Sequence, residues 1–510
     1  MNTLSDLALD ELLKTKSVAI FSDLVLNPIF SAVELELLAR LAESQVPTTV
    51  LTCTGLLPWC FQNTRHSKII CKLCIANREK GQNQATFGWH QQLELSIGAD
   101  RKIQLIHLAS EILSKVQYSL DLVELTHQGV LIGPGICSTL SFSLKNSNIE
   151  LASCMDLAVR LVATSLIIVE ALPEVLKFTE VDALVVGNGR LATNWAASRV
   201  AESMGVKVFS YENLPTQSFY LAPISPAGDM ENVKGSLRHL SQNLLDPMQV
   251  IAAESFFEKQ RFPETHKNEV QALTDKNIFL GLQTEGNLPA GFDSRQRNIA
   301  VFISSEWEFA GLPGWENHLG MSQVEILKEF LGNPALSADI NIWVRFHPHQ
   351  QVVPHEVELT INILGERCRY ILPEEATDSY ALLEACEKII TFGSTLGAEA
   401  TYWGTPSILC GRAEYETLDI SYNPQNHEEL VQLINSDLKS KERTKALPYG
   451  LLRLMRGVDW NYAAIVYPSF PLIRGESSSS LFVRGLYFLK RLLSKIQYET
   501  TRLVRRGLTK

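Results

Sequence analysis

The sequence predicts an α/β protein with two Rossmann-like domains that face a cleft. A chain of 510 residues is longer than one hydrophobic core usually supports, so two domains are expected. In both halves, short β-branched runs alternate with stretches of helical periodicity. Strands and helices that alternate in this way form parallel sheets with helices on both faces.

The N-terminal domain is expected over residues 1–235. Its elements, in order, are strand 18–22, helix 28–42, strand 48–52, helix 149–175, strand 183–186, helix 192–204 and strand 206–210. A segment rich in Pro, Gly and Ser then leads into residues 236–285, which we expect to form a helical connection.

The C-terminal domain is expected over residues 286–450, where the alternation of strands and helices returns. Its elements, in order, are strand 299–303, helix 323–331, strand 342–346, helix 379–386, strand 388–392, helix 396–403 and strand 407–410. Residues 451–510 are expected to be a helical segment that ends in a basic amphipathic tail.

Charge is distributed unevenly along the chain. The formal net charge is −10, and residues 481–510 carry +7 from eight basic residues and one acidic residue, which leaves −17 for the rest. A body this acidic argues against a nucleic-acid partner. The first 21 residues have acidic side chains where a signal peptide needs basic ones, so we expect a cytoplasmic protein.

Polar residues follow three strands of the C-terminal domain. In open parallel sheets, ligands bind beyond the carboxyl ends of the strands, so these residues are candidates for a binding site. They are Ser304, Ser305 and Glu306 after the first strand, Arg345 and His347 at the second, and Ser394, Thr395 and Glu399 after the third.

The third group is the most informative of the three. Gly393 permits a tight turn, and Ser394 and Thr395 then begin a helix, whose free N–H groups and dipole favour a phosphate. Glu399 lies about one turn further on, within reach of a ribose hydroxyl. The alternative is a Ser/Thr helix cap with a solvated glutamate, and His347 has a structural alternative as well.

Four of the nine cysteines are close together in the sequence. Cys53, Cys60, Cys71 and Cys74 have the spacing C-x6-C-x10-C-x2-C, which favours one tetrahedral thiolate site. A structural zinc ion is the first expectation, and an iron–sulfur cluster is the second. Independent thiols or a redox pair are the alternatives without a metal.

The tail at residues 481–510 has the pattern of an interfacial cationic helix. Apolar residues recur at helical spacing with basic residues on the flanks, which predicts contact with a membrane surface. A helix that docks on the acidic body of the protein fits the same pattern.

The strand-end motifs resemble bacterial capsule and surface-polysaccharide glycosyltransferases of the GT-B fold. This group includes the Kdo transferases of capsule synthesis and, more distantly, sialyltransferases with HP and Ser-Ser/Thr motifs. The segments that carry the resemblance are 185–190, 302–309, 344–349, 370–380 and 391–408.

The resemblance implies a donor site on the C-terminal domain for a CMP- or UDP-linked sugar, and an acceptor against the N-terminal domain. It places His347, Ser394 and Thr395 on the phosphate and Glu399 on the ribose. Its further donor-binding residues are Asn188, Arg190, Ser304, Ser305, Glu306 and Arg345. Hydrogen-bond donors and cations would replace a metal in catalysis, and no DxD-type metal motif is well placed for the donor.

The general base stays open between two carboxylates. Asp23 and Glu212 both follow strands of the N-terminal domain, and His347 is a third candidate for a catalytic role. Asn213 after Glu212 and His349 after Pro348 depart from the pattern of the family.

The sequence thus predicts a metal-independent glycosyltransferase that acts on a surface or capsular polysaccharide or on a lipid-linked acceptor. We expect it to lie in the cytoplasm, on the inner face of the plasma membrane if the tail binds lipid. A sugar-nucleotide epimerase of the same fold and a non-catalytic scaffold of a polysaccharide assembly complex are the alternatives.

Overall fold

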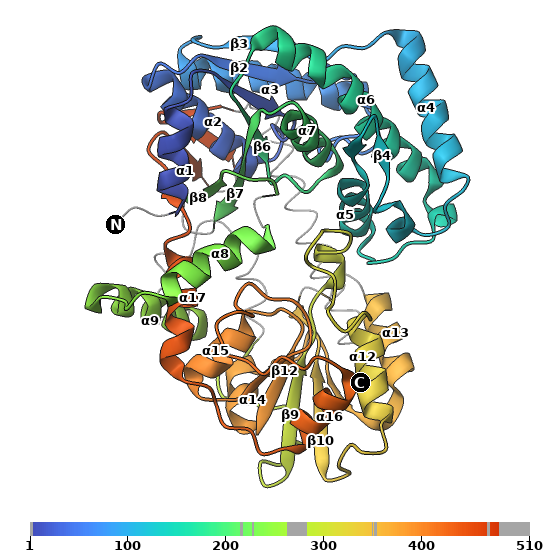
Figure 1. Ribbon diagram of the computed structural model, residues 1–510, viewed down its shortest axis with the longest axis vertical. Helices are drawn as coiled ribbons and strands as arrows, with labels where there is room; N and C mark the ends of the chain where they lie inside the picture. Colours follow the sequence, from blue (N-terminus) through green and yellow to red (C-terminus); the bar gives the residue numbers. More distant parts are fainter. Residues whose placement is uncertain are drawn as a thin grey trace.

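The structure, a computed structural model, describes residues 4–214, 218–226, 229–262, 283–348, 350, 354–466 and 470–478. Two lobes are visible, one drawn in blue and green and the other in yellow and orange (Figure 1). Each lobe has a sheet with parallel strands at its centre, so the predicted fold class, an α/β protein with two Rossmann-like domains, is confirmed.

The N-terminal sheet has seven strands in the order β14-β8-β7-β6-β1-β2-β3. The strands from β7 to β3 are parallel to one another, and β8 and β14 add antiparallel partners at one edge. Their bounds are β1 Val18–Ser22, β2 Thr48–Thr52, β3 Gln91–Glu94, β6 Ala183–Gly187, β7 Lys207–Leu214, β8 Ser218–Ala222 and β14 Val458–Asp459.

Helices cover both faces of this sheet because its central strands are apolar on both sides. In β1, Val18 and Ile20 pack on one face, while Ala19 and Phe21 pack on the other. The first face is covered by α1 (Leu4–Leu13) and α2 (Pro28–Glu43), with α3 (Lys68–Thr86) beside α2. The second face is covered by α4 (Ala99–Leu113), α5 (Gly133–Leu144), α6 (Met155–Thr179) and α7 (Ala192–Ser203).

The C-terminal sheet has five parallel strands in the order β11-β10-β9-β12-β13. Their bounds are β9 Arg297–Phe302, β10 Ile340–Arg345, β11 Arg369–Ile371, β12 Lys388–Thr391 and β13 Ser407–Leu409. On one face lie α12 (Gln323–Gly332), α13 (Pro354–Leu364) and α16 (His427–Asn435), and on the other lie α14 (Ser379–Ala385) and α15 (Leu396–Trp403).

Two helices occupy the described part of the segment predicted as a helical connection. They are α8 (Met230–Ser241) and α9 (Pro247–Arg261), and α9 packs along α17 (Leu447–Leu454). The rings of Phe257 in α9 and Tyr402 in α15 stack with 4.0 Å between their centroids. The connection is therefore anchored to the C-terminal domain.

The segment after α17 differs from the helical prediction. Residues 458–466 and 470–477 form β14 and a three-stranded sheet made of β15 (Ala463–Val466), β16 (Phe470–Ile473) and β17 (Glu476–Ser477). This part of the chain returns to the N-terminal domain, where β15 and β16 pack on α2.

A buried carboxylate holds the start of this segment against α2. The side chain of Glu36 in α2 accepts the backbone N–H groups of Asn461, Tyr462 and Ala463 at 2.9, 2.7 and 2.7 Å. These long-range bonds satisfy donors that a helix would otherwise have used. The predicted basic tail, residues 481–510, lies outside the described residues. Among the residues that the structure describes, no helix is both long and apolar enough to span a membrane.

Candidate functional site

The turn after β12 is shaped by two glycines. Gly393 has φ of 117°, and a Cβ there would lie 2.5 Å from the carbonyl oxygen of Arg412. A Cβ at Gly397 would lie 2.0 Å from the hydroxyl of Tyr415, which itself donates to the carbonyl of Ser394 at 2.8 Å. Larger side chains are therefore excluded from both positions.

The packing of this turn leaves hydrogen-bond donors at the start of α15. Within the part of the chain that the structure describes, the backbone N–H groups of Ser394 and Thr395 have no acceptor. The dipole of α15 adds partial positive charge at the same point. The arrangement suits an anion such as a phosphate.

Glu399 points into the protein and is only 3% exposed. One of its oxygens accepts the hydroxyl of Thr395 at 2.7 Å, and the other accepts the hydroxyl of Tyr380. Glu399 therefore fixes Thr395 at the turn and is not a solvated residue. Tyr380 lies in α14 and was not singled out from the sequence.

At the end of β10, the side chain of His347 is exposed to solvent, whereas that of Arg345 is buried. His347 is exposed, and Gln350 holds its backbone: the N–H of His347 donates to Oε1 of Gln350, and the carbonyl accepts the N–H of Gln350, both at 2.8 Å. Arg345 is 2% exposed and donates to the backbone carbonyls of Leu372, Glu375 and Thr377.

The prediction that Arg345 binds the donor is therefore corrected. Its guanidinium holds the loop after β11, and burial lowers its pKa to about 10. A buried cation needs such partners, because an unpaired charge in the interior is costly.

The end of β9 is organised by Gln323 at the start of α12. Its side chain accepts the N–H of Ser304 at 2.8 Å and donates to the carbonyl of Ser304 at 3.2 Å. Glu306 accepts the backbone N–H of Gln323 at 2.7 Å, and burial raises the pKa of Glu306. Glu306 thus caps a helix, while the hydroxyl of Ser305 is buried without a partner in the described chain.

The three strand ends lie at one edge of the sheet, because β10, β9 and β12 are neighbours. Two strand spacings separate the outer two, which is about 10 Å. His347, Ser304 and Ser394 therefore line one continuous edge, as predicted from the rule for parallel sheets.

The opposite domain meets this edge through the end of β6. Asn188, with φ of 58°, donates from its side chain to Glu212 and accepts the N–H of Arg190 at 3.2 Å. Arg190 donates across the domain boundary to the backbone carbonyl of Glu308. The carboxyl edges of the two sheets therefore face each other.

A second contact lies beside Arg190. The ammonium of Lys145, next to the end of α5, is 3.8 Å from the ring centroid of Phe142 and 3.6 Å from that of Trp307. Glu356 at the start of α13 has its pKa raised to about 7, first by burial and then by Glu306, with Lys145 opposing the shift. Sequence patterns gave no signal for this group, because its members come from three separate segments.

The two candidate bases have different surroundings. Glu212 is bonded to Asn188 and to the N–H of Asn213, and burial raises its pKa while Asn188 and Arg190 lower it. Asp23 is 6% exposed, accepts the hydroxyl of Thr193 at 2.5 Å, and has a second oxygen without a partner among the described residues. Burial raises the pKa of Asp23 to about 7.

Residues 320–442 match the family model described as capsule polysaccharide biosynthesis protein. The match covers 123 of the 510 residues and lies within the C-terminal domain. The predicted resemblance is thereby confirmed for the part of the chain that contains His347, Tyr380, Ser394, Thr395 and Glu399. No curated protein matches the chain.

Three solved structures show distant similarity to parts of the chain. The beta Kdo 2,4 transferase KpsC of Thermosulfurimonas dismutans shares 16% identity, covering 60% of this chain and 87% of that one, with a TM-score of 0.35. Its beta Kdo 2,7 transferase shares 15% identity over 64% and 89%, with a TM-score of 0.33.

The UDP-GlcNAc 2-epimerase of Methanocaldococcus jannaschii shares 15% identity over 57% of this chain and 80% of its own, with a TM-score of 0.26. TM-scores this low do not assign an activity to the chain. The inference about function therefore depends on the family match of residues 320–442 and on the geometry of the strand ends.

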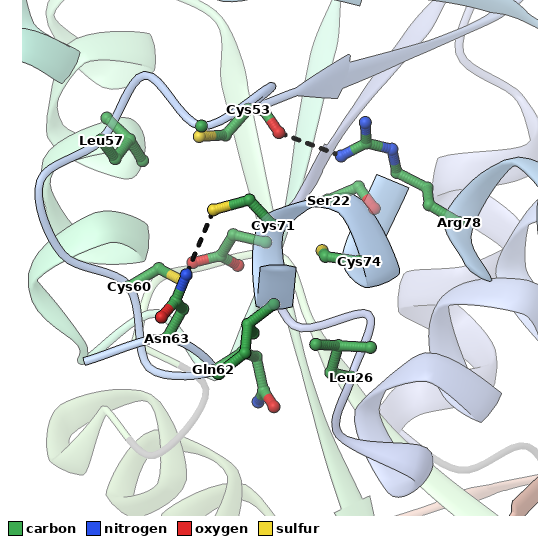
Figure 2. A pocket seen from close by; sticks show the side chains of 13 residues that line it. Ser22, Leu26, Cys53, Leu57, Cys60, Gln62, Asn63, Cys71, Cys74 and Arg78 are labelled. Atoms are coloured by element: carbon green, nitrogen blue, oxygen red, sulfur yellow. Dashed lines mark hydrogen bonds between the residues drawn. The ribbon is translucent and has the colours of Figure 1, made fainter. Parts of the chain in front are cut away.

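Outside that segment, the four clustered cysteines surround one cavity in the N-terminal domain (Figure 2). Cys53 follows β2, Cys60 lies in the next loop, and Cys71 and Cys74 lie in α3. In the described chain, no three Cys, His, Asp or Glu side chains are arranged to hold a metal ion. None of the four cysteines forms a disulfide bond.

Proposed function

We propose that the chain is a glycosyltransferase that moves a sugar from a nucleotide-activated donor to a capsular or surface polysaccharide or to a lipid-linked acceptor. The carrying observation is the turn at Ser394 and Thr395, whose N–H groups lack acceptors in the described chain. This turn directly precedes α15 and lies within residues 320–442, which match the capsule polysaccharide biosynthesis family model.

In this proposal, the donor phosphate lies at the start of α15. The two N–H groups, the hydroxyl of Ser394 and the helix dipole hold its oxygens, and His347 donates from the end of β10, two strands away from β12. These donors stabilise the negative charge that develops on the phosphate as the bond to the sugar breaks, which is the work a metal does in other enzymes.

We assign the general base to Glu212. Its carboxylate belongs to the group of residues that reaches the donor domain, since Asn188 bonds to both Glu212 and Arg190, and Arg190 contacts Glu308. Glu212 takes the proton of the acceptor hydroxyl, the acceptor oxygen bonds to the anomeric carbon, and the nucleotide phosphate leaves with the electron pair. Asp23 is the rival base and faces the cysteine cavity.

Direct assay of sugar transfer tests this function. Purified protein is incubated with CMP- and UDP-linked sugars, with and without capsular oligosaccharide acceptors, and free nucleotide is measured. Release of CMP or UDP that requires the acceptor supports transfer and names the nucleotide. Interconversion of a UDP-sugar without an acceptor would instead support the epimerase, and no binding of any nucleotide would support the scaffold.

The sequence of residues 481–510 supports a position on the cytoplasmic membrane surface. Its net charge of +7 and apolar periodicity suit anionic lipid, on which a lipid-linked acceptor would be held. Co-sedimentation of the full chain with vesicles of anionic and of neutral lipid tests this. Binding to the anionic vesicles that is lost at high salt is expected, and equal recovery with both kinds of vesicle would contradict it.

A further inference from the structure

The cavity around the four cysteines is not used by the proposed transfer reaction. It is lined by Cys53, Cys60, Cys71 and Cys74 together with Asp23 and Arg78. Figure 2 shows the four cysteine side chains placed around this space. None of the other five cysteines lines it.

The loop that carries Cys60 is joined to the start of α3 through Asn63. The side chain of Asn63 accepts the N–H of Ser67 at 2.7 Å and donates to its carbonyl at 2.8 Å. The same amide donates to Sγ of Cys71 at 3.1 Å. Asn63 thus links the two cysteines: its backbone N–H donates to the carbonyl of Cys60, and its side chain donates to the sulfur of Cys71.

Little regular structure holds the chain between β2 and α3. Among the described backbone bonds within residues 53–67, two link neighbouring turns, from Asn63 to Cys60 and from His66 to Asn63. Trp59 bonds to the side chain of Thr164 in α6. A crosslink between sulfur atoms would stabilise a loop of this kind, as structural metal ions do elsewhere.

We propose that this cavity binds one thiophilic metal ion, with zinc as the expected ion and the four cysteines as its ligands. The sulfurs surround the cavity without three of them being placed to share an ion, so binding draws the loop and the first turns of α3 closer together. Each thiol that binds gives its proton to the solvent, and no electron is transferred. This site is independent of the proposed sugar transfer.

Metal content and cobalt titration of the full chain test the site. We expect about one zinc per chain after purification with zinc in the medium, and a thiolate-to-cobalt charge-transfer band when Co²⁺ is added to the metal-free protein. Cys71→Ser should weaken Co²⁺ binding at least about tenfold, because loss of a ligand costs at least as much as loss of its supporting partner.

The matched control is Cys154→Ser, a half-buried cysteine outside the cavity, which should bind Co²⁺ like the wild type. Protein without bound metal and without the cobalt band would overturn the proposal, as would equal binding by both variants. Iron with inorganic sulfide in place of zinc would overturn the zinc assignment.

A measurement on the wild type covers the case in which Cys71→Ser does not fold. Alkylation of the native chain with iodoacetamide, followed by peptide mapping, gives the labelling rate of each cysteine. Zinc should slow labelling at the four cavity cysteines and leave Cys154 unchanged. Equal rates with and without zinc would reject the metal site.

Discussion

The guanidinium of Arg190, just after β6 in the N-terminal domain, donates to the backbone carbonyl of Glu308 in the C-terminal domain. Arg190 also lies 5.2 Å from the ring of Phe142, next to Lys145 and Trp307. This contact joins the carboxyl edges of two sheets whose sequences are separated by the helical connection. Proposed donor and acceptor groups meet at this point.

Loss of the Arg190 contact is expected to destabilise the protein. Arg190→Ala removes a partly buried charged donor, so the free energy of unfolding should fall by about 1.5–3 kcal/mol. Urea unfolding measures the change. The control is Arg295→Ala, whose arginine is exposed and bonds only to Asp293. Equal stabilities for the two variants would show that the domains are held elsewhere.

The donor-site assignment predicts weaker nucleotide binding in two variants. His347→Ala and Ser394→Ala should each lower the affinity for the nucleotide by about 1–3 kcal/mol without a change in melting temperature. Isothermal titration measures the affinity. The exposed residues His107 and Ser110 on α4 provide matched alanine controls. Wild-type affinity in both site variants would remove the assignment.

The base assignment predicts different effects for the two carboxylates. Glu212→Gln keeps the bonds to Asn188 but cannot take a proton, so kcat should fall by about 10²–10⁴-fold while nucleotide affinity stays close to wild type. Asp23→Asn should retain most of the activity. The reverse pattern in initial rates of sugar transfer would move the base to Asp23.

The bond between Tyr380 and Glu399 should be coupled to the turn at Thr395. Tyr380→Phe leaves one oxygen of a buried carboxylate without that donor, so the free energy of unfolding should fall by about 1–3 kcal/mol. Combining it with Glu399→Gln should give less than the sum of the single effects. A double-mutant cycle in urea measures the coupling, and strict additivity would show that the residues act separately.

Glu356 should make stability depend on pH. Its pKa is raised from 4.5 to about 7 in the folded protein, so folding favours the neutral form. Its contribution is fully present below pH 4.5 and is lost as the pH rises through 7. Glu356→Gln should therefore match the wild type at pH 4.5 and melt at a higher temperature above pH 7. Thermal melts across this range test the sign, and a constant difference would contradict it.

Much of the fold could be predicted because it follows from local periodicity. The apolar runs at 18–22 and 183–186 become the adjacent strands β1 and β6, and the run at 388–392 becomes β12. A strand of a parallel sheet is buried on both faces, so its sequence is apolar throughout and is recognisable without knowledge of its partners. The same rule located the candidate site at Ser394 and His347.

The roles of individual side chains could not be predicted from local periodicity. Arg345 has the residue type of a phosphate ligand, yet it bonds to carbonyls about thirty residues away, as the separations of 27, 30 and 32 positions show. Glu306 caps α12 because Gln323 is brought beside it by the fold. Neither partner has a spacing that a sequence pattern records.

The sequence by itself predicted the central strands of both sheets, the positions of the turns at strand ends and the resemblance of the C-terminal half to a family, but not α3, β3, α4 and α5 of the N-terminal domain. These depend on contacts between near neighbours and on the two periods of backbone structure. Tertiary structure alone decided which way Arg345 and Glu399 point, and that β15 and β16 return to α2 as strands. Those outcomes depend on burial and hydrogen bonding between distant segments, since a buried polar group must find its partner wherever the fold places one.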